Sequence, residues 1–152
     1  MKPEKALGAG TRIILRWSDW LRIGGLTGVL SIAAVLLVQR MALAIWPHIV
    51  AFKPLDSYPR TALFTLVPAI GATFVYAWMS SRQAQPERKF LVLSGILLLL
   101  SFIPDFALPL EGKSLLGSSV AAFMHLVAGV VTVATLLTGS RRQAALRQLQ
   151  TA

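Results

Sequence analysis

Three side chains within apolar stretches of this sequence carry groups that could act together: the carboxylate of Asp105, the imidazole of His125 and the guanidinium of Arg40. A carboxylate that hydrogen-bonds one ring nitrogen of a histidine orients the imidazole and leaves the other nitrogen free for a ligand or a proton. An arginine beside them would pair with the carboxylate or stabilise an anion. Whether the three groups meet depends on the elements that carry them.

These elements are four long apolar runs, at residues 21–46, 61–80, 90–110 and 118–138. Each run is close to the ~20 residues that a helix needs to cross the hydrocarbon core of a membrane. The composition agrees, because 55% of the residues are hydrophobic and only 14% are charged, whereas a soluble domain has about 25% charged residues. We therefore predict an all-α integral membrane protein.

The lysines and arginines predict how these spans are oriented. Eleven of the 15 basic residues lie before or at the start of the first run, between the second and third runs, or after the fourth. Since cytoplasmic flanks are enriched in Lys and Arg, both termini are predicted to be cytoplasmic.

A net charge of +9 is also typical of nucleic-acid-binding proteins. Here the charges flank apolar runs, so we expect lipid headgroups and no nucleic acid as partners.

Short connections between the runs predict an up-down-up-down four-helix bundle at residues 21–138, followed by a cytoplasmic tail at residues 139–152. Within residues 1–20, the spacing of Ile13, Ile14 and the two tryptophans that follow predicts a short interfacial helix. The alternative is that this segment is only the start of the first span. The first run exceeds the about 7–15 apolar residues of a signal peptide, so we expect it to be retained.

Small residues spaced four apart predict where the helices touch. Close approach of two backbones drives helix association in a bilayer, since lipid is as apolar as leucine. Gly24 and Gly28 form such a pair in the first run. The second run has a longer ridge, made of Thr61, Thr65, Ala69, Thr73 and Ala77.

An antiparallel bundle brings the three ionisable residues to similar depths near the external end. Arg40 lies six residues before the end of its run, Asp105 five before, and His125 seven after the start of its run. At ~1.5 Å per residue, these depths are about 9, 8 and 10 Å. The candidate polar cluster is completed on the same side by Ser101, Thr65, His48 and Tyr58.

The three central members of this cluster each have a structural alternative. The long side chain of Arg40 can reach the external headgroups instead of Asp105. Because Asp105 follows Pro104, the third helix can also end there and leave Asp105 in a loop. His125 lies within an uninterrupted apolar run and can equally be a packing residue.

No other pattern in the sequence names a reaction. Two histidines and one membrane aspartate are too few for a metal site, and a chain without cysteine has no haem-attachment motif. Walker, HExxH and GxSxG motifs do not occur. We therefore expect neither a metal nor a cofactor.

Short motifs in all four runs are similar to those of a known family. They are Gly24 to Gly28, Leu66-Val67-Pro68-Ala69, Ser101-Phe102-Ile103-Pro104-Asp105 and Met124-His125-Leu126. With them, residues 20–138 resemble a family of small bacterial four-helix membrane proteins of unknown function. The resemblance implies the cytoplasmic membrane of a bacterium and brings no activity, cofactor or catalytic residue with it.

Three classes of function suit the cluster. The first is non-enzymatic: binding of a small amphipathic or lipid ligand in an externally open cleft lined by Arg40, Asp105 and His125, or a role as accessory subunit of a membrane complex. The alternative is a proton-coupled transporter or channel, which would need an oligomer because four spans leave little room for alternating access. An enzyme with His125 as general base is the third, although a binding site needs the same groups without the chemistry. Expected partners are membrane lipids and either further copies of the chain or another membrane subunit.

Overall fold

Four α-helices make up most of the chain in the computed structural model, which describes residues 15–83 and 85–151. They are α1 (Trp17–Ile45), α2 (Tyr58–Arg82), α3 (Pro86–Ala107) and α4 (Leu115–Thr151), with the short 3₁₀ helices η1 (Pro47–Ala51) and η2 (Lys53–Leu55) between α1 and α2. No strand occurs in these described ranges. Each of the four α-helices is long and apolar enough to cross a membrane. The predicted all-α class and the four spans are thus confirmed at this level.

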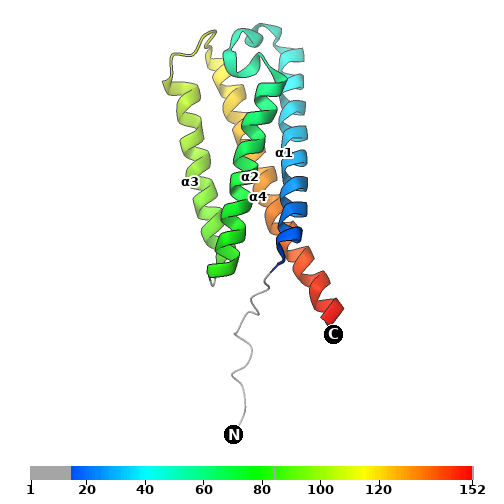
Figure 1. Ribbon diagram of the computed structural model, residues 1–152. Helices are drawn as coiled ribbons and strands as arrows, with labels where there is room; N and C mark the ends of the chain where they lie inside the picture. The colour runs from blue at the N-terminus through cyan, green and yellow to red at the C-terminus, as the bar shows by residue number, and fades with distance from the viewer. Residues whose placement is uncertain (1–14, 84, 152) are drawn as a thin grey trace.

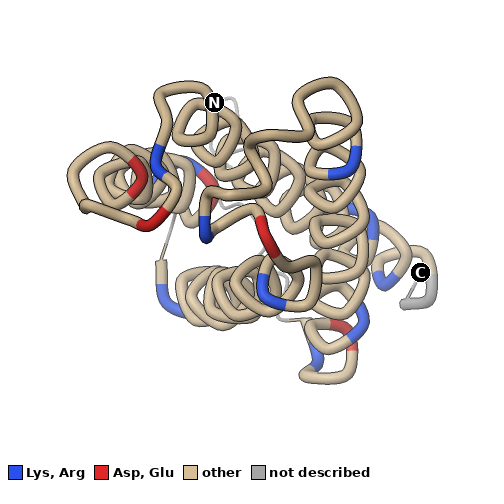
Figure 2. The backbone as a smooth tube through the Cα atoms, turned by 90° about the horizontal axis from the view of Figure 1, so that it is seen from above, with Lys and Arg blue, Asp and Glu red and all other residues tan. Residues whose placement is uncertain are grey.

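The helices run alternately up and down and lie side by side (Figure 1). The start of α1 and the end of α4 lie at one end of this bundle, which we call the terminal end. Helices η1 and η2 and the α3–α4 connection lie at the other, the loop end. Seen along the helix axes, the four helices are grouped around a common centre (Figure 2).

The observed helix ends differ from the predicted ones at three places. No separate interfacial helix precedes the first span within the described residues, because α1 is continuous from Trp17; Ile13 and Ile14 lie outside those residues. Helix α4 continues through the predicted tail to Thr151. Helix α3 passes through Pro104 to Ala107, so Asp105 is helical and the loop alternative is wrong.

Helices α1 and α2 pack through small residues, as predicted. Thr61, Thr65, Ala69 and Thr73 are buried along one face of α2. Opposite them, a methyl group added to Gly24 would lie 2.8 Å from Cγ2 of Thr73, which leaves no room for a side chain. Burying these hydroxyl groups costs little free energy, because Thr65 and Thr73 each donate to a carbonyl of their own helix at 2.8 Å.

Helix α4 packs on the other side of α1 through a few polar contacts within an apolar interface. Near the middle, the hydroxyls of Ser31 and Thr132 are 2.9 Å apart and buried. Towards the loop end, Nε2 of the buried Gln39 donates to the carbonyl of Leu55 at 3.0 Å, while its Oε1 is buried without a hydrogen bond. Gln39 therefore ties η2 to the bundle and leaves half of its amide unsatisfied.

Helix α3 is the least embedded element and stands at the side of the bundle (Figure 1). Only Phe90 and Asp105 are buried on it, one near each end. Phe90 packs on Tyr76, with ring centroids 4.7 Å apart. At mid-length, Leu98 lies over Gly129 of α4. Helix α3 is thus fully buried only near its two ends, and one of these buried contacts is polar.

Candidate functional site

The buried end contact of α3 is formed by Asp105 and His125. Oδ2 of Asp105 lies 3.3 Å from Nε2 of His125 on α4. The carboxylate side chain is 7% exposed, whereas the imidazole is 45% exposed. The structure therefore brings together a buried carboxylate and a half-exposed imidazole that lie twenty residues apart in the sequence.

Although the two groups are at ion-pair distance, their alignment is poor. Oδ2 of Asp105 is buried and accepts no hydrogen bond from the described residues, so the ring N–H does not point well at it. A buried carboxylate oxygen without a donor is destabilising by about 1–3 kcal/mol or more. A protonated imidazole, a proton on the carboxylate or a polar ligand group would each relieve this cost.

Ser118 supports the pair from the first turns of α4. Its hydroxyl donates to the main-chain carbonyl of Asp105 at 2.7 Å, and Ser118 is almost completely buried. This carbonyl is one of the last in α3, where no following helical N–H is present to bond it. Ser118 is not among the site residues predicted from the sequence. Its spacing from His125 could have predicted it, since two residues seven apart lie on one face of a helix.

Arg40 is not brought to Asp105. Its side chain is exposed and forms no ion pair among the described residues. The physical reason is angular: successive residues of a helix are about 100° apart, and it is the neighbouring Gln39 that is buried. Arg40 therefore faces outwards, as expected for an arginine that reaches the headgroups.

The other four members of the predicted cluster form no polar side-chain contact with the pair. His48 and Tyr58 are exposed, in η1 and at the start of α2. The hydroxyl of Thr65 is bonded to Thr61, and that of Ser101 donates to the carbonyl of Leu98 at 2.7 Å. Of the seven candidate residues, only Asp105 and His125 contact each other through their polar groups.

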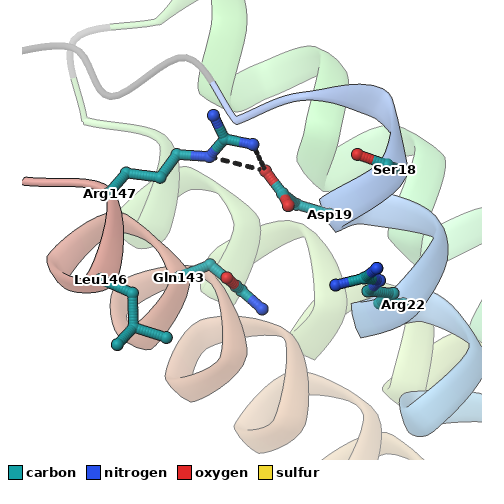
Figure 3. A pocket seen from close by; sticks show the side chains of 6 residues that line it. All are labelled: Ser18, Asp19, Arg22, Gln143, Leu146 and Arg147. Carbon is teal, nitrogen blue, oxygen red and sulfur yellow. Dashed lines mark hydrogen bonds and ion pairs between the residues drawn. The ribbon is translucent and has the colours of Figure 1, made fainter. Parts of the chain in front are cut away.

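A second polar site lies at the terminal end, between α1 and α4 (Figure 3). Here Arg147 donates to Oδ2 of Asp19 from Nε at 2.9 Å, and its Nη2 lies 2.6 Å from the same oxygen. Oδ2 also accepts a hydrogen bond from the backbone N–H of Arg16 at 3.1 Å, and this bond caps the N-terminus of α1. Beside this ion pair is a hollow of about 410 Å³.

A third feature is an apolar groove of about 300 Å³ between α1 and α2, in the terminal half of the bundle. Its lining is apolar apart from Thr73, whose hydroxyl is already bonded to Ala69, and the indole N–H groups of Trp17 and Trp20. Lipid chains can fill such a groove, which has few polar groups to select a ligand. Both hollows lie away from Asp105 and His125.

The described residues contain no group of three or more His, Cys, Asp or Glu side chains that could hold a metal ion. A carboxylate and an imidazole, the groups present at Asp105 and His125, provide hydrogen bonding and proton exchange.

No curated protein and no solved structure matches the chain. A family model matches residues 16–142, which include nearly all of the four helices, and the chain therefore belongs to DUF6069, a family of unknown function.

Proposed function

We propose that this protein is a multi-pass membrane protein that binds a small amphipathic ligand at Asp105 and His125 without transforming it. The observation that carries the proposal is the half-exposed imidazole beside a buried carboxylate that has no hydrogen-bond donor. In most helical bundles a buried polar group is fully hydrogen-bonded. An incompletely bonded group next to an accessible one is the arrangement that a polar ligand can complete.

The imidazole provides the point of contact. Asp105 approaches Nε2, and Nδ1 of His125 forms no hydrogen bond with any described residue. This nitrogen can accept a hydrogen bond from a hydroxyl group or, when protonated, donate one to a carbonyl or phosphate oxygen. A ligand with one such polar group would therefore be recognised at a single ring atom.

The surroundings favour a ligand that is otherwise apolar. Leu126 follows His125 and is exposed on α4, and Ile103 and Phe106 flank Asp105 and are exposed on α3. In a bilayer these side chains contact lipid, so a molecule that reaches the imidazole laterally must be lipid-soluble. A small amphipathic molecule meets both requirements, with its polar group on His125 and its apolar part on these helices.

The topology supports a site in one leaflet. Four spans bring both termini to the same side, and the basic residues at that side favour the cytoplasmic side of a bacterial inner membrane. Asp105 is near the loop end, in the last turns of α3. The ligand would therefore enter from the outer leaflet.

The test is mass spectrometry of small molecules retained after extraction of the protein in a mild detergent. The parent protein should carry a lipid-soluble molecule, and His125→Ala should retain at least about tenfold less of it, as expected for loss of one ligand hydrogen bond. His48→Ala is the matched control, because His48 is an exposed histidine at the same end. Equal retention by all three proteins would refute the proposal, as would the absence of any retained molecule from the parent.

A second candidate is proton transfer by an oligomer, favoured by the same unsatisfied carboxylate oxygen of Asp105. Protonatable groups inside membrane bundles serve as relays in pumps and transporters. Proteoliposomes with an internal pH indicator distinguish the two functions. Proton flux that is abolished in Asp105→Asn would favour the relay, and flux equal to that of empty liposomes would favour ligand binding alone.

A further inference from the structure

The hollow at the terminal end has the composition of an anion site. It lies between the first turns of α1 and the end of α4, and its lining residues are Ser18, Asp19, Arg22, Gln143, Leu146 and Arg147. Its volume of about 410 Å³ is within the range of ~300–1,000 Å³ that ligand pockets occupy. The side chains of Arg22 and Gln143 point into the space between the two helices (Figure 3).

One wall of the hollow is fixed by an ion pair. Asp19, whose side chain is 10% exposed, accepts from Arg147 and from the backbone N–H of Arg16. These contacts hold the end of α4 against the start of α1. The wall is therefore pre-formed and does not need a ligand to assemble it.

The remaining donors of the hollow are unused. The side chains of Arg22, Gln143 and Ser18 form no hydrogen bond or ion pair with any described residue. Asp19 is paired with Arg147, and Arg22 adds to the hollow a positive charge that no described carboxylate pairs with. A planar guanidinium with five donors matches the oxygens of a phosphate group. The chemistry is therefore that of a phosphate site with neutral donors beside it.

The depth of the hollow indicates the source of the phosphate. Trp17 begins α1 directly before Ser18 and is 56% exposed, and exposed tryptophans at the ends of spans lie at the level of lipid headgroups. Leu146, also exposed, adds an apolar edge to the hollow. We infer that this hollow binds the phosphate-bearing headgroup of an anionic phospholipid in the leaflet at the terminal end.

The inference is tested on the full chain in nanodiscs or detergent, with phosphatidylglycerol and phosphatidylcholine as probes and native mass spectrometry as the readout. Phosphatidylglycerol should bind the parent protein more tightly than phosphatidylcholine. Arg22→Gln should weaken phosphatidylglycerol binding about tenfold, the loss expected for one charge-assisted contact, and Arg22→Lys should restore part of it.

Arg40→Gln is the matched control, because Arg40 is also an exposed arginine of α1 and lies towards the loop end. It should leave the preference for phosphatidylglycerol unchanged. Arg22 is exposed, so its variant should melt like the parent, and this is checked first. Equal binding of the two lipids, or equal effects of the two arginine variants, would overturn the inference.

A soluble competitor separates a lipid from a free phosphate compound. Glycerol phosphate at millimolar concentration should displace little phosphatidylglycerol, since it lacks the acyl chains that keep a lipid at this depth. Complete displacement would overturn the assignment to a lipid and identify a soluble phosphate ligand instead. The site is independent of the ligand proposed at His125, and Arg22→Gln should not alter retention of that molecule.

Discussion

The buried carboxylates at the two ends of the bundle, Asp19 and Asp105, are bonded differently. The more exposed carboxylates, Glu87 at the terminal end and Asp56 and Glu111 at the loop end, each pair with a basic residue. At the terminal end, Asp19 accepts hydrogen bonds from Arg16 and Arg147, and Glu87 accepts a hydrogen bond from Nε of Arg141 at 2.9 Å. At the loop end, Asp105 has one poorly aligned neighbour and a buried oxygen without a donor. A fully bonded carboxylate stabilises a fold, whereas an incompletely bonded one costs free energy. Asp19 therefore helps to hold α4 against α1 at the terminal end. The loop end retains a group that a ligand or proton can stabilise.

The largest expected effect would remove the anchor of the terminal end. Asp19→Ala leaves the guanidinium of Arg147 without its carboxylate and exposes the first N–H groups of α1, so the free energy of unfolding should fall by about 3 kcal/mol. Titration with a denaturing detergent measures it. Glu87→Ala is the control, because its pair with Arg141 is exposed and should contribute less than about 1 kcal/mol. Similar losses in the two variants would contradict the proposed role of Asp19 as the anchor.

The packing of α1 on α2 can be broken separately from the ion pair. Gly24→Leu forces a side chain against Thr73 and should destabilise the bundle by about 2 kcal/mol through overpacking. Gly25→Leu should have almost no effect, because no atom lies within 4 Å of the added methyl position. The test is to compare the melting temperatures of the two variants in the same detergent. A larger decrease for Gly25→Leu would show that Gly24 does not lie on the face of α1 that contacts α2.

Asp105 should respond to substitution in the opposite direction to Asp19. Asp105→Asn removes a buried charge whose oxygen has no donor, so the melting temperature should rise, by the equivalent of about 1 kcal/mol. Asp19→Asn should lower it. At the same time, Asp105→Asn should lose the molecule retained by the parent. A lower melting temperature for Asp105→Asn would mean that the carboxylate is structural, and the contrast between the two ends would disappear.

The smallest expected effect concerns the proton on the imidazole. Because Nε2 of His125 faces the carboxylate, its neutral ring should carry the proton on Nε2 and leave Nδ1 bare. The protein has two histidines, so ¹⁵N-histidine labelling with His48→Ala for assignment gives a simple spectrum. Asp105→Asn should change the tautomer populations of His125 and leave those of His48 unchanged. A ring that carries its proton on Nδ1 would show that Asp105 does not orient it.

Much of this architecture could be predicted from local pattern. The apolar runs located all four helices, and the depths calculated for Asp105 and His125 correctly placed them at one level. The small-residue face of α2 was also correctly predicted, since a spacing of four residues repeats along one side of a helix. The ends were less accurate: α1 begins at Trp17 and α4 extends to Thr151, because helix propensity continues where hydrophobicity stops.

The sequence by itself determined the class of the protein, its spans and the shared height of Asp105 and His125, because length and hydrophobicity depend only on neighbours along the chain. Apart from the small-residue face of α2, the tertiary structure decided which way the residues face. It turned Gln39 inwards and Arg40 outwards, and it joined Asp19 to Arg147, which lie 128 residues apart. The height of a residue along the bundle follows from counting residues along its helix. The direction in which its side chain points depends on how that helix is rotated against its neighbours. That rotation is set by the summed contacts of all four helices.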